Sequence, residues 1–314
     1  MLVFVLKKLY VTALTLLGVS VIAFFLMRAV PGDFIDSQLG QFYTEQRAAE
    51  LREQYGLGRP VVVQYGQWLA GVFRGDLGES TYARQPVTTT VIQHLPITLQ
   101  LASMAMLFAL VTGIPLGIFA AIRQGKWLDY ACSSLGVLGV SVPNFWLATL
   151  LILVFSYHLG WLPSGGVYVS PGEDLAQNLR IMLLPTIALG TAVAAVIMRM
   201  TRSSMLEVIG QDYVRTARAK GLAPQVVIVR HALRNAMIPI LTITAIQAGY
   251  LLGGSIVIEF VFNLPGIGML VYRSAEDRDY FLLQAVILLI ATSFIVINLA
   301  VDLVYGLLDP RLRK

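Results

Sequence analysis

The sequence predicts an all-α membrane protein with six transmembrane helices and with both termini in the cytoplasm. First, 57% of the 314 residues are hydrophobic and only 13% are charged, which leaves too little polar surface to cover a water-soluble globule. Second, the chain contains six long stretches without Asp, Glu, Lys or Arg. Each is long enough to cross a hydrocarbon core of roughly 30 Å as a helix. Third, the basic residues gather in alternate loops, as the positive-inside rule requires.

The six spans are predicted within one transmembrane domain of residues 1–314, and each contains one of the charge-free stretches. They lie at about residues 9–29, 97–122, 130–159, 181–208, 235–260 and 280–305. An amino terminus in the cytoplasm places most basic residues inside, including Lys7, Lys8 and the group between Arg199 and Arg234. The net charge of +5 is then a consequence of topology, and it gives no support to nucleic-acid binding.

The first external loop, residues 31–96, contains two predicted helices. One covers Glu45 to Tyr55 with Thr44 as its N-cap, and the other begins at Pro60 and ends near Phe73. The second helix has an apolar stripe, formed by Val61, Tyr65, Trp68 and Val72. We expect this stripe to pack on the membrane domain, and docking of an external partner is the alternative. A shorter external loop from Pro163 to Leu179 has turn sequences.

The internal loop of residues 209–234 has the most informative pattern in the chain. Asp212 is a suitable N-cap for a short helix from Tyr213 to Lys220, Gly221 suits the left-handed position that ends it, and Pro224 opens the next helix. A helix of about eight residues is only about 12 Å long and is too short to be stable alone in water. We therefore expect this helix to pack against another part of the assembly.

This short helix combines basic side chains with small residues. The basic residues are Arg215, Arg218 and Lys220. The small residues are Ala217, Ala219 and Gly221. A basic surface with small residues suits close contact with an acidic or groove-like protein, and membrane phospholipid is the competing partner.

The sequence predicts no enzymatic activity and no cofactor or metal in this chain. The one Gly-Lys pair, Gly125-Lys126, lacks the first glycine and the hydroxyl residue of a phosphate-binding loop, because Ala120 and Trp127 stand there. Three histidines, His94, His158 and His231, have no metal-ligand spacing, and the single Cys132 excludes an intrachain disulfide. Any ATP used must therefore be hydrolysed by another chain.

Few ionisable residues fall within the predicted spans, and those that do are candidates for function. Glu259, near the external end of the fifth span, either faces a translocation pathway or pairs with Arg273 or Arg278. Asn144 in the third span is a second candidate for the pathway. Secondary transporters usually need buried charges for ion coupling, and their scarcity here disfavours that class.

Several motifs resemble those of a known family, the integral-membrane permeases of peptide, glutathione and nickel ABC importers. The coupling-loop motif of that family is similar to Asp212-Tyr213-Val214-Arg215-Thr216-Ala217-Arg218-Ala219-Lys220-Gly221-Leu222, followed by Arg230-His231-Ala232-Leu233-Arg234-Asn235-Ala236 and Ile238-Pro239. Supporting matches are Pro31-Gly32-Asp33, Gly75-Asp76-Leu77-Gly78, Phe262-Asn263-Leu264-Pro265-Gly266-Ile267-Gly268, Asn298-Leu299-Ala300-Val301-Asp302 and Asp309-Pro310-Arg311. The wider importer pattern is Glu-Ala-Ala-xxx-Gly, and the Arg215-Thr216-Ala217 found here before Gly221 resembles the peptide branch.

The resemblance implies a type I ABC importer permease fold in the bacterial cytoplasmic (inner) membrane. It implies a second homologous permease subunit, two cytoplasmic ATP-binding subunits and an external substrate-binding protein as partners, within the lipid bilayer. The residues expected to couple to the ATPase are Asp212, Tyr213, Arg215, Thr216, Ala217, Arg218, Ala219, Lys220 and Gly221. We expect alternating access for short peptides, with glutathione or a nickel chelate as alternative substrates. A stand-alone secondary transporter or channel is the alternative of another class.

Overall fold

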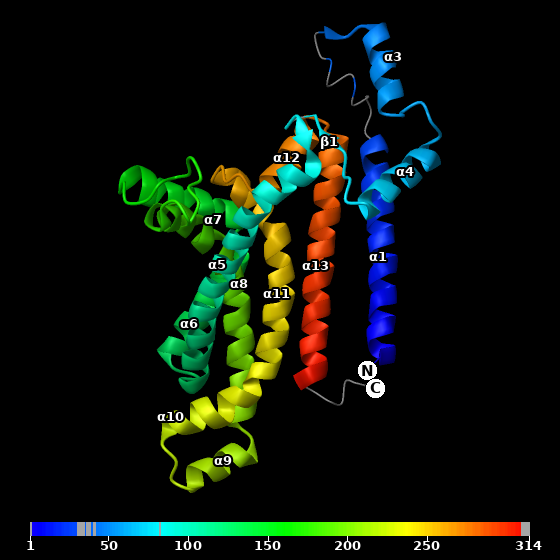
Figure 1. Ribbon diagram of the computed structural model, residues 1–314. Helices are drawn as coiled ribbons and strands as arrows, with labels where there is room; N and C mark the ends of the chain where they lie inside the picture. Colours follow the sequence, from blue (N-terminus) through cyan, green and yellow to red (C-terminus); the bar gives the residue numbers. More distant parts are fainter. Residues whose placement is uncertain (1, 30–34, 36–38, 40–41, 82, 309–314) are drawn as a thin grey trace. The chain divides into compact units, whose positions relative to one another are not determined.

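The computed structural model describes residues 2–29, 35, 39, 42–81 and 83–308, and these residues are mostly helical (Figure 1). The chain divides into two compact units. Unit 1 consists of Met1–Thr98 and Pro265–Lys314, and unit 2 consists of Leu99–Leu264. Unit 1 is therefore formed by the two terminal segments of the chain, and unit 2 is formed by the central segment.

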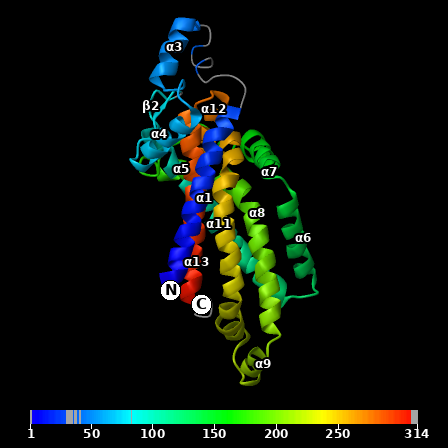
Figure 2. The same ribbon diagram turned by 90° about the vertical axis from the view of Figure 1, so that its right-hand side faces the viewer.

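Unit 1 contains two long helices and several short elements. Its helices are α1 (Leu2–Ala29), α3 (Glu45–Gln54), α4 (Val61–Phe73), the first turns of α5 (Val87–Ile122), α12 (Ile267–Glu276) and α13 (Tyr280–Leu308). Within this unit α1 lies along α13, so that the first and last spans of the chain are neighbours (Figures 1 and 2). The two predicted helices of the first external loop are confirmed as α3 and α4, and the Thr44 side chain accepts a hydrogen bond from Arg47 N at 3.4 Å.

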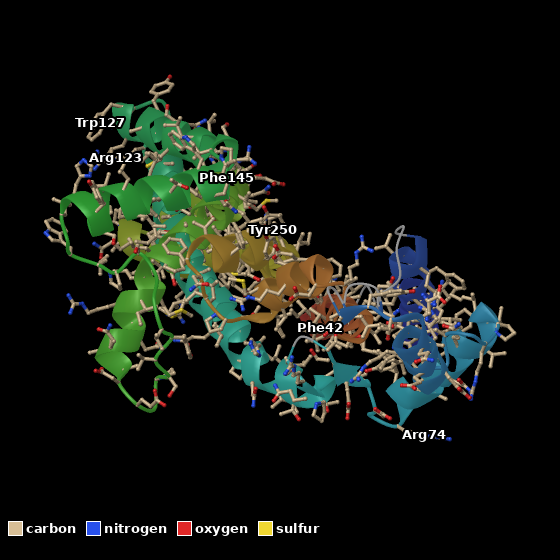
Figure 3. All side chains as sticks on the ribbon, turned by 90° about the horizontal axis from the view of Figure 1, so that it is seen from above. Phe42, Arg74, Arg123, Trp127, Phe145 and Tyr250 are labelled. Carbon is tan, nitrogen blue, oxygen red and sulfur yellow. The ribbon has the colours of Figure 1, made fainter. Side chains whose placement is uncertain are left out.

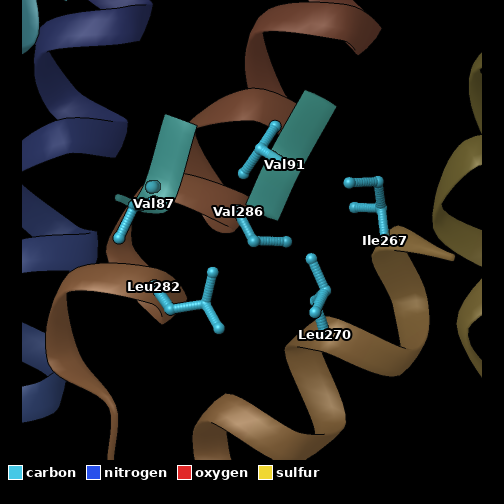
Figure 4. Close-up of a cluster of buried hydrophobic side chains, with 7 residues drawn as sticks. Val87, Val91, Ile267, Leu270, Leu282 and Val286 are labelled. Atoms are coloured by element: carbon cyan, nitrogen blue, oxygen red, sulfur yellow. The ribbon is translucent and has the colours of Figure 1, made fainter. Parts of the chain in front are cut away.

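The core of unit 1 joins elements that are far apart in the sequence. Its buried aliphatic side chains come from the start of α5 and from α12 and α13, and Figure 4 shows Val87, Val91, Ile267, Leu270, Leu282 and Val286 in contact. At the edge of this cluster the buried backbone N–H of Ile267 donates to Thr98 Oγ1 at 2.8 Å. This bond satisfies one of the free N–H groups at the start of α12.

A short hairpin is fixed to the start of α13 by a buried hydrogen-bond network. Its strands are β1 (Glu79–Ser80) and β2 (Gln85–Pro86), which pair antiparallel. Asp279 caps α13 by accepting from Leu282 N at 3.0 Å, and its other oxygen accepts from Ser80 Oγ at 2.7 Å. These two-residue strands are the one departure from the predicted all-α class among the described residues.

Unit 2 is built around α8 (Leu175–Ile209). The other helices are the remainder of α5, α6 (Trp127–Ser141), α7 (Asn144–Leu151), the π-helix η2 (Ile152–His158), α9 (Asp212–Ala219), α10 (Pro224–Val226), the π-helix η3 (Val227–Leu233) and α11 (Arg234–Val261). Helices α6, α7 and α11 all pack on α8, and most of the apolar part of α8 is buried. By contrast, Arg123 and Trp127 lie at the outer edge of this unit (Figure 3).

Glycine allows α5 to approach α8 closely. A Cβ at Gly117 would lie only 2.6 Å from the carbonyl oxygen of Met198, and one at Gly190 would lie 2.9 Å from that of Ala105. Small residues of this kind are frequent where membrane helices contact each other. Any larger residue at these positions would separate the two helices.

Two helices begin earlier in the chain than the apolar stretches that mark their predicted spans. Helix α5 begins at Val87 and runs through Pro96, so the last part of the predicted external segment 31–96 is helical. Helix α8 begins at Leu175, where Asp174 accepts a hydrogen bond from Gln177 N at 3.0 Å. The loop that starts at Pro163 therefore ends before Leu179.

The third predicted span, residues 130–159, is bent and not straight. Its two halves, 127–141 and 144–158, meet at an angle of 103°. Val142 at the bend has an extended backbone (φ −80°, ψ 122°), because a following proline, Pro143, disfavours the helical conformation of the residue before it. The described residues contain five helices long and apolar enough to cross a membrane, or six if this bent pair forms one span.

Candidate functional site

The candidate site is α9 with the turns that join it to α8 and α11. In both ribbon views this segment lies at the end of α8 and α11 that is opposite to α7 (Figures 1 and 2). The predicted order of helix, glycine break and helix is confirmed by the bounds of α9 and by the helix that begins at Pro224. The site is therefore a compact projection from the central helices of unit 2.

The start of α9 differs by one residue from the prediction. Gln211 is the N-cap, with an extended backbone (φ −72°, ψ 148°), and its carbonyl oxygen accepts from Val214 N at 3.1 Å. Asp212 is the first helical residue and not the cap. Its carboxylate still lies at the helix amino terminus, where negative charge is favourable.

A narrow apolar face holds α9 on unit 2. Val214 and Ala217 are buried, and they form a small cluster with Val227 of η3 and with partly buried Val208 of α8. The other residues between Gln211 and Lys220 are exposed. Ala217 therefore packs inward and is not part of an outward small-residue surface, whereas Ala219 and Gly221 are exposed.

One polar contact supplements this packing. The amide of Asn235 at the start of α11 donates to the Tyr213 hydroxyl at 2.7 Å and also to the carbonyl oxygen of His231 at 3.2 Å. The Tyr213 hydroxyl is within 3.5 Å of the same carbonyl oxygen. Tyr213 thus ties α9 to α11 by a contact that the sequence pattern did not reveal.

The end of α9 depends on the backbone conformation of Gly221. This residue has φ +78°, and its N–H donates to the carbonyl oxygen of Arg218 at 2.9 Å. A Cβ at Gly221 would meet no atom within 4 Å. Positive φ, and not close packing, is therefore the reason for glycine at this position.

The segment after Pro224 passes through η3 into α11, and it is fixed in the core of unit 2. Ala232, Ala236 and Ile240 are buried against Met205 of α8 and Ala121 of α5. The π-helical conformation of η3 was not predicted from the sequence. A displacement of α9 would thus act directly on two central helices.

The exposed surface of α9 is basic. Arg215, Arg218 and Lys220 all face solvent, and the guanidinium of Arg215 lies 3.4 Å from the carboxylate of Asp212. Both partners of this ion pair are exposed, so the pair contributes little to folding. The charges are therefore available to a partner with an acidic surface.

The two residues predicted for the pathway lie in different settings. Glu259 in α11 is completely buried, whereas Asn144 is half-buried at the first position of α7, directly after the bend. A partly buried ion pair in the same unit was not predicted, in which Arg202 Nε and Nη2 donate to the two oxygens of buried Asp129 at 2.6 and 2.9 Å. An isolated Asp at the start of an apolar helix was its only signal in the sequence.

Comparison with known proteins defines the class of this chain. Residues 113–314 match the model of the family described as binding-protein-dependent transport system inner membrane component. Residues 1–102 match the model of the corresponding amino-terminal region. The chain belongs to this family and is an inner membrane permease of a binding-protein-dependent importer.

The relatives are similar over their whole length. The chain is 39% identical to the dipeptide transport system permease protein DppB of Alkalihalophilus pseudofirmus, over 100% of both chains. It is 42% identical to the glutathione transport system permease protein GsiC of Salmonella choleraesuis, over 100% of this chain and 99% of that protein.

Solved structures show the same fold. The membrane chain in a crystal structure of the MetNI methionine ABC transporter in inward-facing conformations gives a TM-score of 0.56 at 19% identity, and covers 70% of this chain and 96% of that chain. At this identity the likeness concerns the fold, and it supports the predicted type I importer architecture.

Proposed function

We propose that this chain carries short peptides across the membrane by alternating access, and that α9 transmits the force from a cytoplasmic ATPase. The observation that carries the coupling role is the geometry of α9. It is held by two buried apolar side chains and ends at a glycine with φ +78°. It also presents Arg215, Arg218 and Lys220 to solvent.

The connections of α9 explain how such a force would act. Its amino end follows α8 after two residues, and its carboxyl end continues through η3 into α11. Tyr213 and Val214 hold it to the same two elements. Because α8 and α11 pack on each other along the centre of unit 2, a rigid movement of α9 would tilt both.

The proposed assembly contains a second homologous permease, two ATP-binding subunits on the cytoplasmic side and an external substrate-binding protein. The family description supports the dependence on a binding protein. ATP binding would close the ATPase pair, the movement would pass through α9, and the spans would open toward the docked binding protein. Asp212 to Gly221 are the residues proposed to meet the ATPase.

Cross-linking tests the coupling role. In a Cys132→Ser background, Lys220→Cys should be joined to the co-expressed ATPase by a short thiol-to-amine cross-linker, which reacts with the introduced cysteine and with a lysine of the ATPase. Val62 on α4 is 75% exposed, and Val62→Cys serves as the control. Helix α4 is expected on the other side of the membrane from the ATPase. If both cysteines cross-link to the ATPase equally, or if neither does, then α9 does not form the proposed contact with the ATPase.

Short peptides are proposed as the substrate class because relatives with this sequence similarity are named for dipeptide and peptide transport. Glutathione is the second candidate, since the similarity to a glutathione permease is of the same size. Titrating the substrate-binding protein that docks on this permease with dipeptides, glutathione and a nickel chelate separates the three. Tight binding of the nickel chelate alone would remove the peptide proposal.

A further inference from the structure

A cavity of about 220 Å³ lies within unit 1, at the end of α1 that carries Arg28. Its walls come from α1, α4, the turn before β1 and the start of α13. The lining includes Arg28, Trp68, Asp76, Tyr280 and Gln284. No residue proposed for ATPase coupling belongs to this cavity.

Two buried donors in this lining have no acceptor among the described residues. These are Nε1 of Trp68 and Nε2 of Gln284. The Gln284 side chain belongs to a residue that is only 2% exposed. Buried N–H groups in proteins almost always have a partner, which is protein, water or a bound molecule. Two such donors beside one cavity indicate a missing acceptor.

The Arg28 guanidinium adds positive charge to the same cavity. It donates to Gln64 Oε1 at 2.7 Å and to the carbonyl oxygen of Phe24 at 3.2 Å, and it lies 3.7 Å above the Phe24 ring. Gln64 is held in turn by donating to the carbonyl oxygens of Leu57 and Arg59. Arg28 forms no ion pair with any carboxylate in the described part of the chain. Its remaining N–H groups therefore have no protein acceptor there.

The position of Arg28 along α1 suits the headgroup layer of a membrane. The apolar span of α1 ends at Leu26, and Arg and Trp side chains typically lie where a span leaves the hydrocarbon core. The adjoining turns of α1 expose Ile22, Phe25 and Leu26. An acyl chain could therefore lie along α1 while a polar group occupied the cavity.

We propose that this cavity binds the phosphate group of a membrane phospholipid, with Arg28, Trp68 and Gln284 as donors. A phosphate offers several charged acceptor oxygens, which form strong hydrogen bonds to guanidinium and N–H groups. The carboxylate of Asp76, which accepts from Gly78 N at 3.0 Å, would face a hydroxyl or amine of the same headgroup. A soluble phosphate ester has the same chemistry, and water alone is the remaining occupant.

Lipid retention by the complex that co-purifies with the tagged chain tests this proposal. After delipidation in detergent, phosphatidylglycerol is titrated and the bound lipid is counted by native mass spectrometry. Arg28→Gln should weaken retention about tenfold, because it replaces a charge-assisted contact by a neutral one, and Trp68→Phe should weaken it several-fold. The matched control is Arg74→Gln, an exposed arginine at the end of α4 (Figure 3), which should retain lipid like the wild type.

Thermal unfolding separates lipid binding from a purely structural role. Gln284→Met removes the unpaired donor at similar volume, so it should keep or raise the unfolding temperature without lipid. The same variant should lose the rise in unfolding temperature that phosphatidylglycerol gives to the wild type. A structural Gln284 would instead lower the unfolding temperature equally under both conditions, and that result would overturn its role as a donor.

Other outcomes would also overturn the proposal. A wild-type complex that retains no phosphatidylglycerol would leave water as the occupant. Equal retention by Arg28→Gln, Trp68→Phe and Arg74→Gln would place the lipid elsewhere. If glycerol 3-phosphate or inorganic phosphate stabilises the complex as well as the lipid does at equal concentration, the site binds a soluble phosphate and not a phospholipid.

Discussion

Helices α4 and α9 are both short and both lie outside the predicted spans, but they are attached in opposite ways. Helix α4 contacts α1 through aromatic rings, with ring centroids 5.3 Å apart for Phe24 and Tyr65 and 5.6 Å apart for Phe24 and Trp68. Helix α9 is held by the small side chains of Val214 and Ala217. Aromatic pairs contribute more burial and more directional contact than two small aliphatic groups. The contact of α4 is thus aromatic and leaves none of its residues buried, whereas the contact of α9 is aliphatic and buries Val214 and Ala217.

The exposed surfaces of the two helices differ in polarity. Helix α4 exposes apolar side chains such as Val62 and Phe73, and α9 exposes Arg215, Arg218 and Lys220. A charged outer surface suits a partner in water, whereas the aromatic side chains of α4 attach it to α1 of its own unit. This contrast predicts that changes in α9 affect transport and that changes in α4 affect assembly.

The largest expected effect concerns the side of the membrane on which each helix lies. In a Cys132→Ser background, Val62→Cys on α4 should react with a membrane-impermeant thiol reagent added to intact cells, and Ala219→Cys on α9 should not react. Both positions are exposed in the structure. After permeabilisation both should react. Labelling of Ala219→Cys in sealed cells would reverse the predicted orientation and with it the proposed ATPase contact.

Gly221→Val should abolish uptake while leaving the amount of assembled complex near normal. A β-branched residue resists the φ of +78° at a local cost on the order of 1–3 kcal/mol, which is small beside the burial of the spans. The angle between α9 and α10 would change, so ATPase activity should lose its stimulation by loaded binding protein. Uptake and stimulated ATPase activity are measured on the purified complex in liposomes.

Gly210→Val at the other end of α9 is the matched control for this change. Gly210 has a negative φ of −77°, and a Cβ there would lie 3.6 Å from the nearest atom. Valine should therefore be accommodated with most of the uptake retained. Full uptake in Gly221→Val, or a loss in proportion to lost complex, would contradict the coupling role of α9.

Tyr65→Ala should lower the stability of the complex but not its activity per molecule. The variant removes the ring contact with Phe24 and the hydrogen bond between the Tyr65 hydroxyl and Ser20 Oγ at 2.8 Å. Losses of this kind are worth about 1–3 kcal/mol together. The unfolding temperature and the yield should fall, with unchanged uptake per assembled complex. Uncoupled ATPase activity in this variant would show that α4 also has a role in transport.

Features that depend on neighbouring residues in the chain were predicted better than contacts between residues that are far apart in the sequence. The bounds of α3, α4 and the end of α9 follow from Thr44, Pro60 and Gly221, because caps and positive φ depend on neighbours in the chain. The sequence Val142-Pro143 also contained the signal for the bend between α6 and α7.

The contacts that hold the candidate site in place could not be predicted in this way. The bond between Tyr213 and Asn235 joins residues that are 22 positions apart, and that between Arg202 and Asp129 joins residues 73 positions apart. Charge and hydropathy do not specify which residues of different helices meet. The pairing of the two ends of the chain in unit 1 was hidden for the same reason.

The smallest expected effect is that of Arg215→Glu, and its dependence on salt is the informative part. Arg215 is exposed and, within the described part of the chain, pairs only with exposed Asp212, so its replacement should leave folding and yield unchanged. Against an acidic partner surface the reversed charge should instead weaken the contact and reduce coupled ATPase activity several-fold at low ionic strength. Because surface charges are screened over about 8 Å at physiological ionic strength, the difference between variant and wild type should shrink as salt is raised. Arg74→Glu on α4 serves as the control and should show no such trend, since α4 is expected to lie on the opposite side of the membrane. An Arg215→Glu complex with the wild-type dependence on salt would mean that α9 meets its partner through its apolar residues and not through its charges.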